Sequence, residues 1–154
     1  MIEETVFKDN KEIINFVKET YGINITNVER INRGSANIYS LNDNTYVLKE
    51  FQSKYTLDEI EKEITIINHL KKDSIPVPAY IKTMDNNYAV LYKERVIIIQ
   101  EYIDGYTLES NEGNLEQTLE CADIYGCIVK SLETLSIELP SSDIKDWYSI
   151  YTFD

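Results

Sequence analysis

The chain has 154 residues, of which 43% are hydrophobic and 27% are charged, and these values are typical of a soluble globular domain. Its net charge of −12, from 15 basic and 27 acidic residues, argues against a nucleic-acid-binding protein, which would normally carry the opposite balance. Because the longest aliphatic run covers only residues 96–99 and the acidic N-terminus does not resemble a signal peptide, we expect a cytoplasmic protein with no membrane partner.

The first part of the chain predicts one helix followed by three strands. An apolar stripe that ends before Gly22 predicts a helix over residues 10–20. Three segments rich in β-branched and aromatic residues follow, and the turn-rich sequences NRGSA and NDN separate them. This pattern is typical of an antiparallel meander, with strands expected over residues 25–31, 37–41 and 46–51.

A second helix and three more strands are predicted next. Thr56, with Glu59 three residues later, has the pattern of a capping box and should begin a helix that ends near Leu70. The sequence IPVP then prevents further helix, because proline has no amide hydrogen and restricts the residue before it. Strands are expected over residues 79–83, 88–92 and 95–103, the last two as a hairpin.

The sequence becomes helical after a polar stretch. Residues 104–114, DGYTLESNEGN, are interpreted as a linker, and residues 115–135 predict a long helix. Cys121 and Cys127 lie on different faces of that helix, so we expect them to be reduced and partly buried. Residues 144–154 are expected to begin another helix. The order of the elements predicts an α+β fold with a mainly antiparallel sheet.

Lys49 is an unusual residue for so apolar a strand. Side chains alternate along a strand, so Lys49 shares a face with Val47 and Phe51. On a helical wheel, Glu63 lies roughly 60° from the centre of the apolar stripe of the second helix, and it is the acid best placed to reach Lys49. A lysine–glutamate pair held in this way can position the ammonium against a phosphate. From spacing alone, two separately solvated side chains are an equal alternative.

Two loops offer further candidates for a binding site. Gly34, Ser35 and Ala36 join two strands, and backbone amides in such a turn can approach an anion closely. This loop is not a P-loop, because no Lys-Ser/Thr pair and no helix follow the glycine. The strand IIIQEYI ends at a linker, where its last backbone groups could bond a flat heterocycle. An ordinary hairpin turn and an ordinary strand end are the alternatives.

Taken in order, these motifs resemble the N-terminal lobe of the aminoglycoside phosphotransferase and choline kinase family, which has a protein-kinase-like fold. The matching motifs are GSANIY, YVLK, EKEITIINHL, IPVP and IIIQEYIDGY. The resemblance implies a kinase-like N-lobe over residues 1–103, a hinge over 104–114, and the first helical part of an incomplete C-lobe over 115–154.

The resemblance also implies a nucleotide site, with ATP or GTP and Mg²⁺ as cofactors. Lys49 would hold the α- and β-phosphates and pair with Glu63. The remaining implied contacts are Gly34, Ser35 and Ala36 over the phosphates, Val47 above the base, Gln100 at the gatekeeper position, and the backbones of Glu101 and Ile103 at the adenine edge.

The family's catalytic loop, His-x-Asp-x-x-x-x-Asn, and its metal-binding aspartate belong to a second lobe. The only histidine, His69, lies in a predicted helix, and no asparagine follows Asn114. We therefore expect no catalytic and no metal-binding residue in this chain, which would be truncated before the catalytic loop and inactive alone. The small-molecule hydroxyl acceptor, such as an aminoglycoside, choline, a sugar or homoserine, would bind the full-length parent.

Two other functions stay open at this stage. The chain could be a stand-alone, non-catalytic module that binds a nucleotide or a protein, or a structural domain unrelated to kinases. In either kinase-like case, the helix over residues 115–135 should expose apolar surface. The hypothesis that follows is a homodimer, with exchange of the C-terminal helix as one way to form it.

Overall fold

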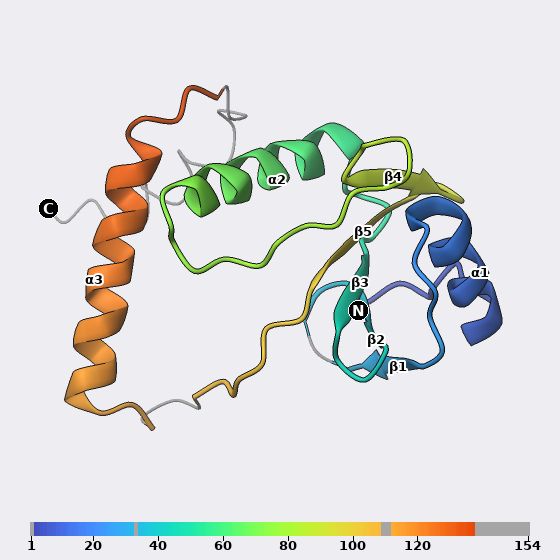
Figure 1. The fold of residues 1–154 in the computed structure, drawn as a ribbon, viewed down its shortest axis with the longest axis horizontal. Coiled ribbons are helices and arrows are strands. Elements are labelled where there is room, and N and C mark those ends of the chain that lie inside the picture. Colours follow the sequence, from blue (N-terminus) through green and yellow to red (C-terminus); the bar gives the residue numbers. More distant parts are fainter. Residues whose placement is uncertain (1, 33, 109–111, 138–154) are drawn as a thin grey trace, which may run out of the picture.

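The computed structural model describes residues 2–32, 34–108 and 112–137, which form one antiparallel sheet and three helices (Figure 1). The sheet has five strands in the order β1-β2-β3-β5-β4, so β3 is the central strand. The elements in chain order are α1 (Asn10–Tyr21), β1 (Val28–Ile31), β2 (Asn37–Leu41), β3 (Tyr46–Glu50), α2 (Leu57–Lys72), β4 (Ala89–Tyr92), β5 (Arg95–Glu101) and α3 (Leu115–Leu132).

The helix ends have the local causes that the sequence predicts. Gly22 ends α1 in the left-handed conformation at φ 69°, and its amide donates to the Lys18 carbonyl. Thr56 and Glu59 form the expected capping box at the start of α2, each side chain accepting a bond from the other's backbone amide. Both helices therefore begin and end within two residues of their predicted bounds.

The sheet is covered on both faces, by α1 on one and by α2 on the other (Figure 1). Leu48 of β3 packs with the α1 cluster, whereas Ile98, opposite Lys49 in the register, packs with Ile60 and Ile64 of α2. Residues 96–99 of β5 are fully buried because they serve both cores. Val47 and Lys49 therefore face the α2 side of the sheet, as predicted.

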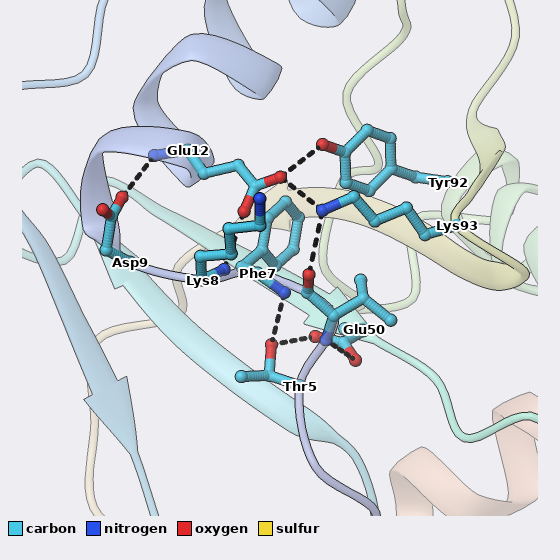
Figure 2. A network of polar contacts seen from close by, with 9 residues as sticks. Thr5, Phe7, Lys8, Asp9, Glu12, Glu50, Tyr92 and Lys93 are labelled. Atoms are coloured by element: carbon cyan, nitrogen blue, oxygen red, sulfur yellow. Dashed lines mark hydrogen bonds and ion pairs between the residues drawn. The ribbon is translucent and has the colours of Figure 1, made fainter.

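The N-terminal segment before α1 is tied to the sheet by polar contacts that the sequence analysis missed (Figure 2). Glu50 of β3, only 1% exposed, accepts hydrogen bonds from the Thr5 hydroxyl at 2.5 Å and from the Val6 amide at 3.1 Å. Glu12 of α1 accepts bonds from the Tyr92 hydroxyl at 2.9 Å and from Lys93 in the β4–β5 turn. The N-terminal segment is thus bonded to the central strand β3, and the start of α1 is bonded to the edge strand β4.

Two strand predictions need correction. Residues 79–83 form no strand but only a single bridge, Tyr80 to Gln100, because the Thr83 amide instead bonds the Asn87 carbonyl at 2.7 Å and turns the chain away. The strand expected over 25–31 begins only at Val28. The other predicted strands and their antiparallel pairing are confirmed.

Helix α3 contacts the C-terminal end of α2 and otherwise stands apart from the sheet (Figure 1). The Ser131 hydroxyl donates to Asp73 at 2.6 Å, and the His69 ring lies 3.0 Å from the Ser131 carbonyl. Cys121 and Cys127 are free but exposed, so the expectation of partial burial was wrong. The predicted helix over 144–154 lies outside the described residues, and no helix within them has the length and apolar character to cross a bilayer.

Candidate functional site

A cleft of about 510 Å³ lies where the α2 face of the sheet meets the chain that leaves β5. Ligand-binding pockets usually enclose between roughly 300 and 1,000 Å³, so this cleft can hold a small heterocyclic molecule. Its lining residues come from β1, β3, β5 and the segment after β5. They are Ile31, Val47, Gln100, Tyr102, Ile103, Gly105, Tyr106 and Thr107.

Lys49 is half-buried on the same face of the sheet as this cleft. In the β3–β5 register, Val47 pairs with Gln100 and Lys49 pairs with Ile98, which makes Lys49 a diagonal neighbour of Gln100. Burial lowers the pKa of Lys49, and the charge of Glu63 opposes that shift. The ammonium is therefore a partly desolvated cation, which gains more from a nearby anion than a fully hydrated one would.

Glu63 acts on Lys49 through its charge rather than through a direct ion pair. Among the ion pairs of the described residues, none joins the two side chains. Glu63 instead accepts a hydrogen bond from the Tyr80 hydroxyl at 3.1 Å, and burial together with the Glu63 charge raises the pKa of Tyr80. The pairing of Lys49 with Glu63 in a nucleotide complex stays a prediction.

The loop of Gly34, Ser35 and Ala36 follows β1, whose last residue, Ile31, lines the cleft. Gly34 has a φ of 84°, and a Cβ there would lie 3.3 Å from the Ile38 side chain, so the position requires glycine. The Ser35 carbonyl accepts a bond from Gln52 at 2.5 Å. Gly34 and Ser35 are exposed, whereas Ala36 is buried.

The predicted base-binding residues separate into two groups. Val47, Gln100 and Ile103 all line the cleft. Glu101 is exposed, and its amide is already bound to the Ala79 carbonyl at 2.8 Å. Among the hydrogen bonds of the described residues, none uses the amide of Ile103, which leaves this donor available at the cleft.

The sequence analysis missed five cleft residues and one unpaired atom. The residues are Ile31, Tyr102, Gly105, Tyr106 and Thr107, and the two tyrosines of EYIDGY were the signal that could have identified the outer wall of the cleft. Gln100 is 8% exposed, and its Oε1 is buried with no hydrogen-bond partner among the described residues. No sequence pattern reveals an unpaired atom.

Known proteins resemble this chain in family and in fold. The model of the phosphotransferase enzyme family matches residues 27–148. A spectinomycin phosphotransferase in complex with ADP and spectinomycin has a TM-score of 0.65 at 20% identity, over 94% of this chain and 47% of that one. An amicoumacin kinase in complex with AMP-PNP and Ca²⁺ has a TM-score of 0.73 at 13% identity, over 86% of this chain and 42% of that one. A microcompartment-associated aminopropanol kinase has a TM-score of 0.65 at 15% identity, over 84% of this chain and 42% of that one.

These similarities concern the fold, because the identities are low. They confirm the expected α+β, kinase-like architecture. The chain spans less than half the length of each of these solved structures. No curated protein matches the sequence.

Proposed function

Because the chain belongs to the phosphotransferase enzyme family, we propose that it forms the nucleotide-binding lobe of a small-molecule kinase. One observation carries this proposal: a half-buried lysine shares a sheet face with a cleft of about 510 Å³. The cleft would take the base of ATP or GTP, and Lys49 would meet the phosphates. Residues 1–103 would be the lobe, 104–114 its hinge, and 115–154 the start of a helical lobe.

The proposed work of this lobe is to bind and orient the nucleotide. Val47 and Ile31 would cover one side of the base, and the free Ile103 amide would donate to its edge. Lys49 would neutralise phosphate charge, and the anion would offset the desolvation that lowers the pKa of this lysine. Glu63 would hold the ammonium on the cleft side, and the loop at Gly34 would cover the phosphates.

Mg²⁺ would accompany the nucleotide, since it bridges phosphate oxygens and neutralises their charge during phosphoryl transfer. Within the described residues, no group of three or more acidic, histidine or cysteine side chains could hold a metal ion. We propose that the metal ligands and the catalytic residues of the kinase lie outside these residues. The acceptor is proposed to be a small-molecule hydroxyl compound, and the compartment to be the cytoplasm.

Nucleotide titration of wild type and Lys49→Ala tests the proposal. Losing a charge-assisted contact costs about 1.5–3 kcal/mol, so the dissociation constant for ATP should rise by roughly 10- to 100-fold. Lys11→Ala is the matched control, because it removes the same charge from the exposed side of α1, which covers the other face of the sheet. Its affinity should stay within about twofold of wild type. An unchanged affinity in Lys49→Ala, or no saturable binding by wild type, would refute the proposal.

A stand-alone binding module is the second candidate, and it would use the exposed surface of α3, which the first candidate predicts as well. Five large apolar side chains of this helix are between 41% and 75% exposed, namely Leu115, Leu119, Ile124, Tyr125 and Val129. Exposed apolar surface of this kind marks a protein-interaction site. A homodimer that buries this surface is the specific form of the hypothesis.

A further inference from the structure

The loop of residues 34–36 is held in place at two points. It is followed by Asn37, the first residue of β2, whose side-chain amide donates to the backbone carbonyl of Glu3 at 3.1 Å. Within the loop, the Ser35 carbonyl accepts a bond from the Gln52 side chain at 2.5 Å. One point of attachment is therefore the N-terminal segment, and the other is the chain that follows β3.

Glu3 also bonds to this second attachment. Ser53, which directly follows Gln52, donates to the Glu3 carboxylate from its backbone amide at 2.9 Å and from its hydroxyl at 2.7 Å. Arg95 of β5 forms an ion pair with the same carboxylate. Through its carbonyl and its side chain, Glu3 thus joins the two segments that hold the loop.

The attachment at Asn37 is buried, whereas the loop itself is conformationally permissive. Asn37 is 3% exposed, donates to Glu50 at 3.2 Å and accepts a bond from Arg30 at 2.7 Å, so its amide cannot turn away without breaking several bonds. Gly34, in contrast, is exposed at a φ of 84°, and glycine has little conformational preference of its own. The position of the loop therefore depends on its attachments.

The loop lies near the face of the sheet that carries Lys49. A Cβ on Gly34 would lie 3.3 Å from the Ile38 side chain, and Ile38 pairs with Lys49 in the β2–β3 register. Asn37 pairs instead with Glu50, which faces the N-terminal segment. The bond from Asn37 to this segment thus controls a loop near the opposite face.

We propose that Glu3 is a positioning residue, which holds residues 34–36 in the conformation that receives the phosphates of the nucleotide. This inference rests on the proposed nucleotide-binding function. A loop that becomes ordered only when the ligand binds loses conformational entropy at that step, so a loop ordered beforehand increases the affinity for a ligand that touches it. A ligand without phosphates does not reach the loop and gains nothing from its order.

Titration of Glu3→Ala with ATP and with adenosine tests this role. Because the Glu3 side chain is 37% exposed, the variant should fold. If the fraction of correctly placed loop falls to about a tenth, the dissociation constant for ATP rises about tenfold, while that for adenosine stays within about twofold. Glu3→Gln, which keeps one acceptor oxygen, should give an intermediate value for ATP.

Glu4→Ala is the matched control. It removes the same charge one position further along, from an exposed side chain that forms no ion pair among the described residues. Both dissociation constants should stay within about twofold of wild type. Gln52→Ala removes the attachment at Ser35 and should also weaken ATP alone. Combined with Glu3→Ala, it should weaken ATP by less than the product of the two single effects, since both act on the same loop.

The outcomes separate this inference from the function on which it rests. Wild type that binds ATP, together with an unchanged ratio of ATP to adenosine affinity in Glu3→Ala, overturns the role of Glu3 and leaves nucleotide binding in place. An equal loss for both ligands also overturns it, because the substitution then damages the whole site. If Glu3→Ala does not fold, the same ratio measured for Gln52→Ala decides. Absence of ATP binding by wild type removes both proposals together.

Discussion

Replacement of Glu50 by alanine should destabilise the protein far more than loss of an ordinary glutamate. This carboxylate is 1% exposed and accepts bonds from Thr5 at 2.5 Å and Val6 at 3.1 Å (Figure 2). It also accepts a bond from Asn37 at 3.2 Å. Asn37 keeps a second acceptor in the Glu3 carbonyl at 3.1 Å, so two donors would lose their partner. Each unsatisfied donor costs about 1–3 kcal/mol, and the cavity adds to this, so we expect a loss of roughly 3–5 kcal/mol.

Urea unfolding of a set of variants measures this loss. Glu29→Ala, on an exposed position of the edge strand β1, is the control and should cost less than about 0.5 kcal/mol. Glu50→Gln keeps one acceptor oxygen and should fall between the two. Combination with Thr5→Val should cost less than the sum of the single changes, since both remove the same bond. A Glu50→Ala variant within about 1 kcal/mol of wild type would show that the network contributes little.

Three further predictions concern other parts of the chain. Gly34→Ala should destabilise by about 1 kcal/mol because of its positive φ, whereas Gly126→Ala, in a helix with open space around it, should stabilise by a similar amount; urea midpoints that move in the same direction would contradict this. Hydrogen bonds to the Lys8 amide, Lys93 and Tyr92 lower the pKa of Glu12 from 4.5 to about 2, so its stabilising effect should be complete above pH 4.5 and disappear as the pH falls towards 2. The stability difference between wild type and Glu12→Gln, followed by urea unfolding, should shrink over that range, and a constant difference would argue against the network. Leu119→Lys should weaken self-association in sedimentation velocity, and a wild-type chain that stays monomeric in concentrated solution would rule out the apolar surface of α3 as a dimer contact.

The sequence predicted the elements whose signals are local. The capping box at Thr56 and the glycine at position 22 mark helix ends through bonds made within a few residues. The two-residue periodicity of β3 predicted that Lys49 shares a face with Val47, and the register confirms this. The strand expected over residues 79–83 does not form because the Thr83 amide bonds the Asn87 carbonyl in a turn instead. Hydrophobic periodicity does not detect such a turn.

The features of the fold and of the candidate site that depend on distant contacts could not be predicted. From its sequence context, Glu50 is expected to be an exposed strand residue. It is buried because Thr5 and Val6, more than forty positions away in sequence, cover it and donate to it. Whether the Oε1 of Gln100 has a hydrogen-bond partner depends on the positions of all its neighbours in the fold. The cleft residues Tyr102 and Tyr106 acquire their place only from the path of the chain after β5.

Because side chains alternate between the two faces of the sheet along β3, the length of the turn before this strand decides which face each side chain occupies. Lys49 and Glu50 lie on opposite faces of the same strand, Lys49 on the face that holds the cleft and Glu50 beneath the N-terminal segment. A shift of β3 by a single residue would move each of them to the opposite face, with the lysine on the side of the N-terminal segment and the carboxylate on the side of the proposed phosphates. Asn42, Asp43 and Asn44 in the preceding turn all have positive φ and fix where the strand starts. The length of this turn therefore determines which face of the sheet each β3 side chain occupies. An insertion of two residues into it should be tolerated, whereas an insertion of one should not.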